Sequence, residues 1–87
     1  MIYISPYKTD DPQIVYSQLA KEDGVIIFGT GNCGAIAQLA LKEANINVVA
    51  LSDNNMHRWG TKIDGVEVIP PEQIKLDYGK LPVLIAV

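Results

Sequence analysis

The sequence has a single cysteine, no cluster of basic residues and no long apolar run, and each shortage argues against a class of protein. Cys33 alone cannot form an internal disulfide or a cysteine-based zinc site, which fits a reducing compartment. The net charge of −3, with 7 Lys and Arg against 10 Asp and Glu, argues against non-specific nucleic-acid binding. No apolar segment approaches the roughly 18 residues that span a bilayer, and the first residues lack a signal-peptide pattern. We therefore expect a cytoplasmic protein with no membrane span and no nucleic-acid partner.

The sequence does have enough apolar side chains for a folded core. Of its 87 residues 48% are hydrophobic and 20% are charged, which is ordinary for a folded domain. Repeats, linkers and low-complexity segments are not found. We therefore expect one domain over residues 1–87, with an N-terminal extension and helix in 1–23 and a core in 24–87.

The glycine-rich stretch at residues 29–34 carries the strongest functional signal. It has the form G-x-G-x-x-G, follows the apolar run 25–28 and precedes the alanine-rich run 35–44, which predicts a strand, a glycine turn and a helix. Such a turn places a pyrophosphate close to the backbone at a positively polarised helix N-terminus. We therefore predict phosphate binding by Gly29, Thr30, Gly31, Asn32, Cys33 and Gly34. The alternative is a strand-to-helix turn that only needs a positive φ angle at a glycine.

A second signal is the carboxylate of Asp53, directly after a predicted buried strand over 47–52. Gly34 and Asp53 are 19 positions apart, close to the spacing of a carboxylate that binds a ribose hydroxyl in dinucleotide-binding domains. We therefore predict that Asp53 and the adjacent Asn54 belong to the cofactor site. The alternative for Asp53 is an N-cap of the following turn, and the two roles are compatible.

The other segments predict the rest of a small α/β fold. A short strand or an ordered tail is expected near the N-terminus. Helix starts are expected at Asp10-Asp11-Pro12 and at Pro70-Pro71, and further strands over 66–69 and 81–87. Numbered from 25–28, the core strands are expected in the order 3-2-1-4, as a Rossmann-like parallel sheet with helices on both faces. In the helix after Gly34, the spacing predicts an apolar face towards the sheet, made of Ile36, Leu39, Ala40 and Ala44.

The apolar last strand ends the chain with no helix to cover it. An exposed sheet edge of this kind is a liability in a monomer. We therefore expect either a homo-oligomer or a module that is fused to, or associated with, a larger catalytic partner.

Two segments, residues 25–34 and 51–72, resemble the Rossmann-type sugar-nucleotide-binding domain of bacterial polysaccharide-biosynthesis proteins. This group includes the N-terminal domains of capsular-polysaccharide dehydratases/epimerases and of sugar acetyltransferases. The second segment, with acid-Asn-Asn, Trp-Gly and Ile-x-Gly-x-x-Val-Ile-x-Pro-Glu, is the more specific, and the resemblance covers about residues 24–87. It implies a module that binds NAD(P) or a nucleotide-sugar, with the diphosphate on the glycine loop and the ribose at Asp53.

The sequence departs from this group in ways that bear on catalysis. It lacks the Tyr-x-x-x-Lys pair of short-chain dehydrogenases, the hexapeptide repeat of acyltransferases and a histidine in the glycine loop. We therefore predict no catalytic residue and no metal site in this chain. Two other functions stay open: an interaction or regulatory scaffold that assembles through residues 83–87, and the methyl-donor-binding domain of a methyltransferase.

Three residues beyond Asp53 have both a functional and a structural interpretation. An arginine such as Arg58 next to His57 accepts a ribose 2′-phosphate in some dinucleotide-binding domains, whereas elsewhere such residues form solvated surface. Trp59 could stack on a base or a sugar. The structural interpretation of Trp59 is a hydrophobic plug that anchors the loop to the sheet.

Overall fold

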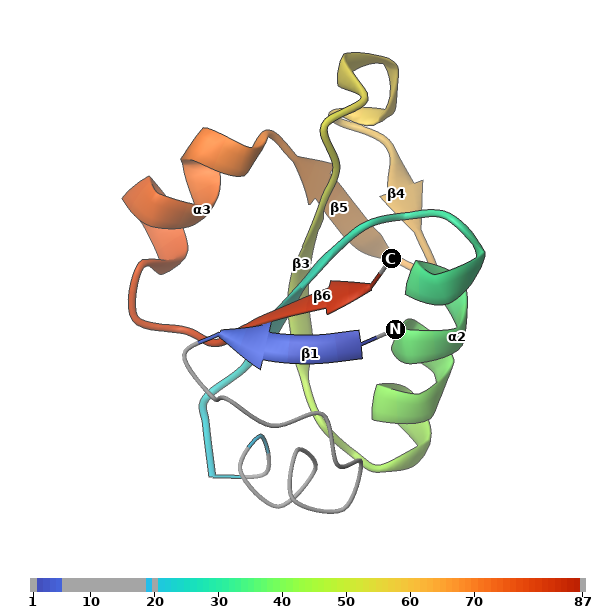
Figure 1. The fold of residues 1–87 in the computed structure, drawn as a ribbon, viewed down its shortest axis with the longest axis vertical. Helices are drawn as coiled ribbons and strands as arrows, with labels where there is room; N and C mark the ends of the chain where they lie inside the picture. The colour runs from blue at the N-terminus through green and yellow to red at the C-terminus, as the bar shows by residue number, and fades with distance from the viewer. Residues whose placement is uncertain (1, 6–18, 20, 87) are drawn as a thin grey trace.

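The computed structural model describes residues 2–5, 19 and 21–86, and within them strands form one mixed sheet with helices beside it (Figure 1). The six strands of the sheet lie in the order β1-β6-β2-β3-β5-β4. Along the chain the elements are β1 (Ile2–Ser5), β2 (Val25–Phe28), α2 (Asn32–Glu43), β3 (Val48–Ser52), the 3-10 helix η1 (Met56–Arg58), β4 (Lys62–Ile63), β5 (Val66–Ile69), α3 (Pro71–Tyr78) and β6 (Val83–Ala86).

The centre of the sheet is parallel and its two borders are antiparallel. Strands β6, β2, β3 and β5 pair with one another in parallel, whereas β1 pairs antiparallel with β6 and β4 pairs antiparallel with β5. The α/β class is therefore confirmed. The strand order differs from the predicted four-stranded 3-2-1-4 sheet because β1 and β4 extend it at both ends, although the parallel strands follow one another as β5-β3-β2-β6.

Strand β4 was missed because it is only two residues long and carries no hydrophobic pattern. It pairs with β5 through the turn at Asp64 and Gly65, whose φ angles of 52° and 80° are both positive. Asp-Gly is the dipeptide typical of a two-residue hairpin turn with this left-handed geometry. The sequence predicts a turn at Asp64-Gly65, directly before the alternating run 66–69, but it does not predict strand β4.

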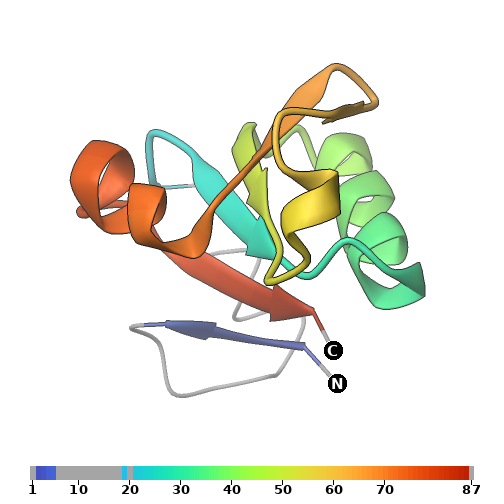
Figure 2. The ribbon, with the colours of Figure 1, turned by 90° about the horizontal axis from the view of Figure 1, so that it is seen from above.

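The prediction that the last strand is an exposed edge is wrong. Strand β6 lies between β1 and β2, and its register with β1 runs from Val83 opposite Ser5 to Ala86 opposite Ile2. Figure 2 shows β1 alongside β6. The backbone of β6 is therefore paired on both sides, which removes the basis for assembly through residues 83–87.

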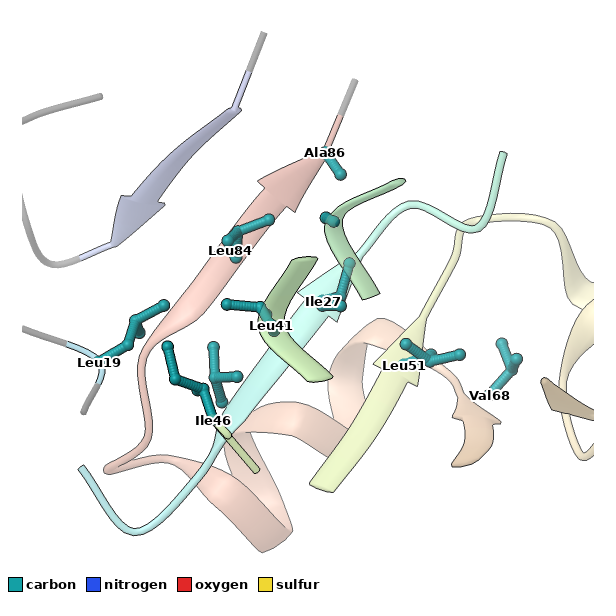
Figure 3. Close-up of a cluster of buried hydrophobic side chains, with 10 residues drawn as sticks. Leu19, Ile27, Leu41, Ile46, Leu51, Val68, Leu84 and Ala86 are labelled. Carbon is teal, nitrogen blue, oxygen red and sulfur yellow. The ribbon is translucent and has the colours of Figure 1, made fainter. Parts of the chain in front are cut away.

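Helices cover both faces of the sheet (Figure 2). Because successive side chains of a strand point to opposite faces, Ile27 of β2 packs into the larger core cluster under α2 and Ile26 packs into a smaller cluster with α3. Figure 3 shows the larger cluster, which brings Leu41 of α2 together with strand residues and with Leu19. Leu19 is 1% exposed. The rest of the helix that was predicted to start at Asp10-Asp11-Pro12 falls largely outside the described residues.

The predicted buried face of α2 is also wrong. Ile36 and Leu39 are 65% and 58% exposed, while the buried residues of this helix are Gly34, Ala37, Gln38 and Leu41. The cause is the contact at the start of the helix, where Gly34 packs directly against the carbonyl of Gly29 and thereby fixes which face meets the sheet. Burial of polar Gln38 is compensated because its Nε2 donates a hydrogen bond of 3.0 Å to the Ile63 carbonyl.

Candidate functional site: the glycine loop and Asp53

The glycine loop lies at the carboxyl edge of the parallel strands, between β2 and α2. The Gly29 N–H donates to the Ser52 carbonyl at 2.8 Å, so the loop begins as a continuation of the β2 and β3 pairing. Open α/β sheets bind ligands at this edge, where neighbouring strands connect to opposite faces. Here β2 leads into α2 on one face, and α3 leads into β6 from the other face.

The three glycines of the loop differ in what a Cβ atom would meet at each position. Gly29 has a φ angle of +111°, and a Cβ atom there would collide with the Ala86 carbonyl. A Cβ atom on Gly34 would collide with the Gly29 carbonyl. Gly31 has a φ angle of −79°, and a Cβ atom on it would meet nothing within 4 Å. The fold therefore requires glycine at positions 29 and 34 but not at Gly31.

Asp53 and Thr30 join the end of β3 to the glycine loop. The Asp53 Oδ2 atom accepts two hydrogen bonds from Thr30, one from the backbone N–H at 3.0 Å and one from the hydroxyl at 2.6 Å. The predicted site residues Thr30 and Asp53 are thus brought together, with each other as partners. This contact fixes the second residue of the loop relative to the neighbouring strand.

The same carboxylate also begins the turn that follows β3. Its Oδ1 atom accepts the Asn55 N–H at 2.8 Å, and the Asn55 side chain in turn accepts the His57 N–H at 3.1 Å. The N-cap alternative for Asp53 was therefore close to the observed role, although the residue that caps η1 is Asn55. Asn54, a predicted site residue, is exposed between them.

Arg58 and Trp59 add further hydrogen bonds to Thr30 and Asp53. The Arg58 Nη1 atom donates to the Thr30 carbonyl at 3.2 Å and to the Thr30 hydroxyl oxygen at 3.1 Å. The Trp59 indole N–H donates to the Asp53 carbonyl at 2.7 Å, and its ring packs against the larger core cluster. The plug interpretation of Trp59 is therefore the one the contacts support. The contact between Arg58 and Thr30 was not predicted, because 28 positions separate the two residues.

These contacts favour the ionised form of Asp53. The hydrogen bond from the Thr30 hydroxyl is the largest cause that lowers the pKa of Asp53 below its ordinary value, followed by the Asn55 N–H. Partial burial acts in the opposite direction, while the Thr30 N–H and the positive charge of Arg58 add to the lowering. At neutral pH the site therefore holds one carboxylate beside one guanidinium.

The other two residues of the predicted loop, Asn32 and Cys33, open α2. Asn32 is exposed, whereas Cys33 is half-buried and packs against the larger core cluster. These contacts favour a structural role for the small side chain of Cys33. In the described part of the chain, no group of three or more His, Cys, Asp or Glu residues is arranged to hold a metal ion.

Three hollows on the described surface lie away from the glycine loop and Asp53. One of about 390 Å³ lies at the other end of α2, where Lys42 and Asp64 form an exposed ion pair of 3.3 Å at its wall. None of the predicted site residues lines it. Its charged groups are paired with each other, so it offers no converging free charge for a ligand. Across the described ranges no helix is both long and apolar enough to cross a membrane.

Fold and site together define a small α/β domain with a glycine-rich strand-to-helix loop, to which the neighbouring strand contributes a carboxylate. The model of the family described as C2185-like, N-terminal, matches residues 21–84, and the chain belongs to this family. No curated protein and no solved structure matches the chain.

Proposed function

We propose that this domain is a Rossmann-like module that binds NAD(P) or a nucleotide-sugar, with the diphosphate on the loop from Gly29 to Gly34. The observation that carries the proposal is the open space at Gly31. Gly29 and Gly34 are explained by backbone collisions within the fold, but the fold leaves room for a side chain at Gly31. A glycine at this position leaves the backbone accessible to a pyrophosphate, which is its role in dinucleotide-binding loops.

The first turn of α2 supports an anionic ligand at this position. An α-helix leaves its first N–H groups without intrahelical partners, and Gly31 has no side chain with which to cap them. The first turn also contains no acidic residue that would compensate the positive end of the helix dipole. Arg58, held on Thr30, adds a full positive charge next to the loop.

The proposal assigns binding to this chain and chemistry to a catalytic partner, fused or associated, in nucleotide-sugar modification or polysaccharide biosynthesis. Two observations support this division. The resemblance over residues 25–34 and 51–72 is to binding domains of such enzymes, and the family is described as an N-terminal one. The contacts of the described site join one carboxylate, one guanidinium, the Thr30 hydroxyl and backbone groups. These groups suffice to hold a phosphate ester.

Calorimetric titration of the chain with NAD, NADP and UDP-sugars tests the proposal, with S-adenosylmethionine as the probe for the methyltransferase alternative. We expect saturable binding of at least one nucleotide, weakened at least tenfold by Gly31→Val because the new side chain fills the space above the loop. Ala44→Val, at the opposite end of α2, is the matched control and should leave the affinity unchanged. Thermal unfolding verifies that both variants are folded. Binding of S-adenosylmethionine alone, or of no nucleotide, contradicts the proposal.

A further inference from the structure

Within the proposed function, on which this inference rests, we infer that the ribose end of the nucleotide is recognised through a phosphate by Arg58. Asp53 is then a positioning residue that holds the loop, and the ligand class is a nucleotide phosphorylated on its ribose, such as NADP. The inference reverses the sequence-based assignment, in which the Asp53 carboxylate binds the ribose hydroxyls.

The first step is the hydrogen-bonding capacity of Asp53. A carboxylate that recognises a ribose diol accepts one hydroxyl on each oxygen, and each oxygen has two acceptor sites. In this structure both sites of Oδ2 are taken by the N–H and the hydroxyl of Thr30. Oδ1 accepts the Asn55 N–H, which leaves a single acceptor site on the whole carboxylate. Recognition of both ribose hydroxyls would therefore break a contact that fixes the glycine loop.

The second step is the donor capacity of Arg58. A guanidinium has five N–H donors, and the contacts with Thr30 use those of Nη1. Arg58 is exposed, and within the described residues its hydrogen bonds use Nη1 alone, which leaves Nε and Nη2 without a protein partner there. A phosphate monoester matches this donor set because guanidinium and phosphate groups form paired, charge-assisted hydrogen bonds.

The third step is the position of these groups on the sheet. In dinucleotide-binding domains the residues just after the second parallel strand of the βαβ unit meet the ribose, and here those residues follow β3. The Asp53 carboxylate at this point is hydrogen-bonded to Thr30. Arg58 is hydrogen-bonded to the same threonine and keeps further N–H donors for a ligand. A ribose phosphate gains the guanidinium as a partner, whereas an unmodified ribose would compete with Thr30 for Asp53.

Calorimetry with two matched ligand pairs tests the inference: NADP against NAD, and 2′,5′-ADP against 5′-AMP. We expect the ligands with a 2′-phosphate to bind about tenfold tighter or more, because one charge-assisted contact distinguishes the members of each pair. Arg58→Gln should bring both ratios close to one, and Arg58→Lys should keep part of the preference. Lys42→Gln, which removes an exposed positive charge at the other end of α2, is the control and should preserve the ratios.

The role of Asp53 is tested by Asp53→Asn in the same titrations. If Asp53 is a positioning residue, the substitution should lower the affinities for NADP and NAD by the same factor, because both ligands bind the glycine loop that Asp53 holds in place. A selective loss of NAD binding would show that the carboxylate binds the ribose and would overturn the inference.

The remaining outcomes separate this inference from the proposed function. Equal or tighter binding of NAD in the unmodified chain overturns the inference, as does a NADP preference that survives Arg58→Gln. Binding of UDP-sugars alone also overturns it, yet leaves the proposed function standing. Absence of binding by every nucleotide tested overturns the proposed function itself.

Discussion

Replacement of Asp53 by asparagine should destabilise the fold at neutral pH even without ligand. Asparagine keeps one side-chain oxygen, which can accept the Asn55 N–H, but its NH₂ group cannot accept the two hydrogen bonds that Oδ2 receives from Thr30. Each bond to a partly exposed charged group contributes about 1 kcal/mol, so we expect a loss of about 2 kcal/mol. For a chain of 87 residues this corresponds to a melting temperature lower by about 10 °C.

The pH dependence of this loss identifies its cause. The pKa of Asp53 is lowered in the folded state, so the ionised carboxylate contributes stability above its unfolded pKa, and this contribution disappears as the pH falls through the folded pKa. The difference between the unmodified chain and Asp53→Asn should therefore be full at pH 7 and should shrink below about pH 4. The asparagine variant has no group at this position that titrates.

Urea denaturation at pH 7 and at low pH measures both quantities, with the fluorescence of Trp59 as the probe. Trp59 is the single tryptophan, and its indole N–H is bonded to the Asp53 carbonyl, so it reports on this region directly. Asp64→Asn is the matched control, because Asp64 has a φ angle of 52°, which asparagine tolerates, and its ion pair is with the exposed Lys42. It should change the stability by less than about 0.5 kcal/mol. Equal stability of Asp53→Asn and the unmodified chain at pH 7, or a difference independent of pH, refutes the reasoning.

Two further predictions test the packing around the site by chemical denaturation. Gly34→Ala should lower the free energy of unfolding by more than about 3 kcal/mol or prevent folding, because its Cβ atom would collide with the Gly29 carbonyl. Gly31→Ala should lower it by at most about 1 kcal/mol. Similar losses in the two variants would contradict the conclusion that the fold requires glycine at position 34 but not at position 31. Leu41→Ala should cost about 2–5 kcal/mol and Leu39→Ala less than about 1 kcal/mol, since Leu41 is 1% and Leu39 58% exposed. A larger loss for Leu39→Ala than for Leu41→Ala would instead support the buried face that was predicted from the hydrophobic spacing.

The sequence predicts those parts of the fold that have strong local signals. The strand at 25–28, the glycine turn and the alternating strand at 66–69 were predicted at or near their observed bounds, because apolar runs and glycines specify them locally. Asn45 directly follows the alanine-rich run 35–44, which predicts a left-handed C-cap there, and its φ angle is 60°. The segment 54–60 ends in a glycine, which predicts a turn that closes at Gly60, and the φ angle of Gly60 is 83°.

The errors arise where tertiary contacts override local pattern. In α2 the large apolar side chains Ile36 and Leu39 predicted one buried face, but the face with Gly34, Ala37 and Gln38 is the one that meets the sheet. The close backbone contact at Gly34 determines this orientation of the helix. The two-residue strand β4 is stabilised by pairing with β5 and carries little pattern of its own. A short strand or an ordered tail was expected near the N-terminus, and the strand is observed as β1, but its pairing with β6 was not predicted. The edge position of the last strand was predicted wrongly for the same reason.

The role of Asp53 shows why spacing alone does not determine what a site residue binds. A residue that follows the second parallel strand of a βαβ unit arrives beside the glycine loop in any such fold, because parallel strands end at the same edge of the sheet. What the carboxylate binds then depends on the loop residue that faces it. Here that residue is Thr30, which offers two donors to a single carboxylate oxygen and, through its own oxygens, accepts from Arg58. A glycine or alanine at position 30 would leave the carboxylate with one donor fewer and Arg58 without the threonine hydroxyl. The identity of Thr30, rather than the distance between Gly34 and Asp53, therefore decides whether this edge of the sheet presents a free carboxylate or an anchored guanidinium.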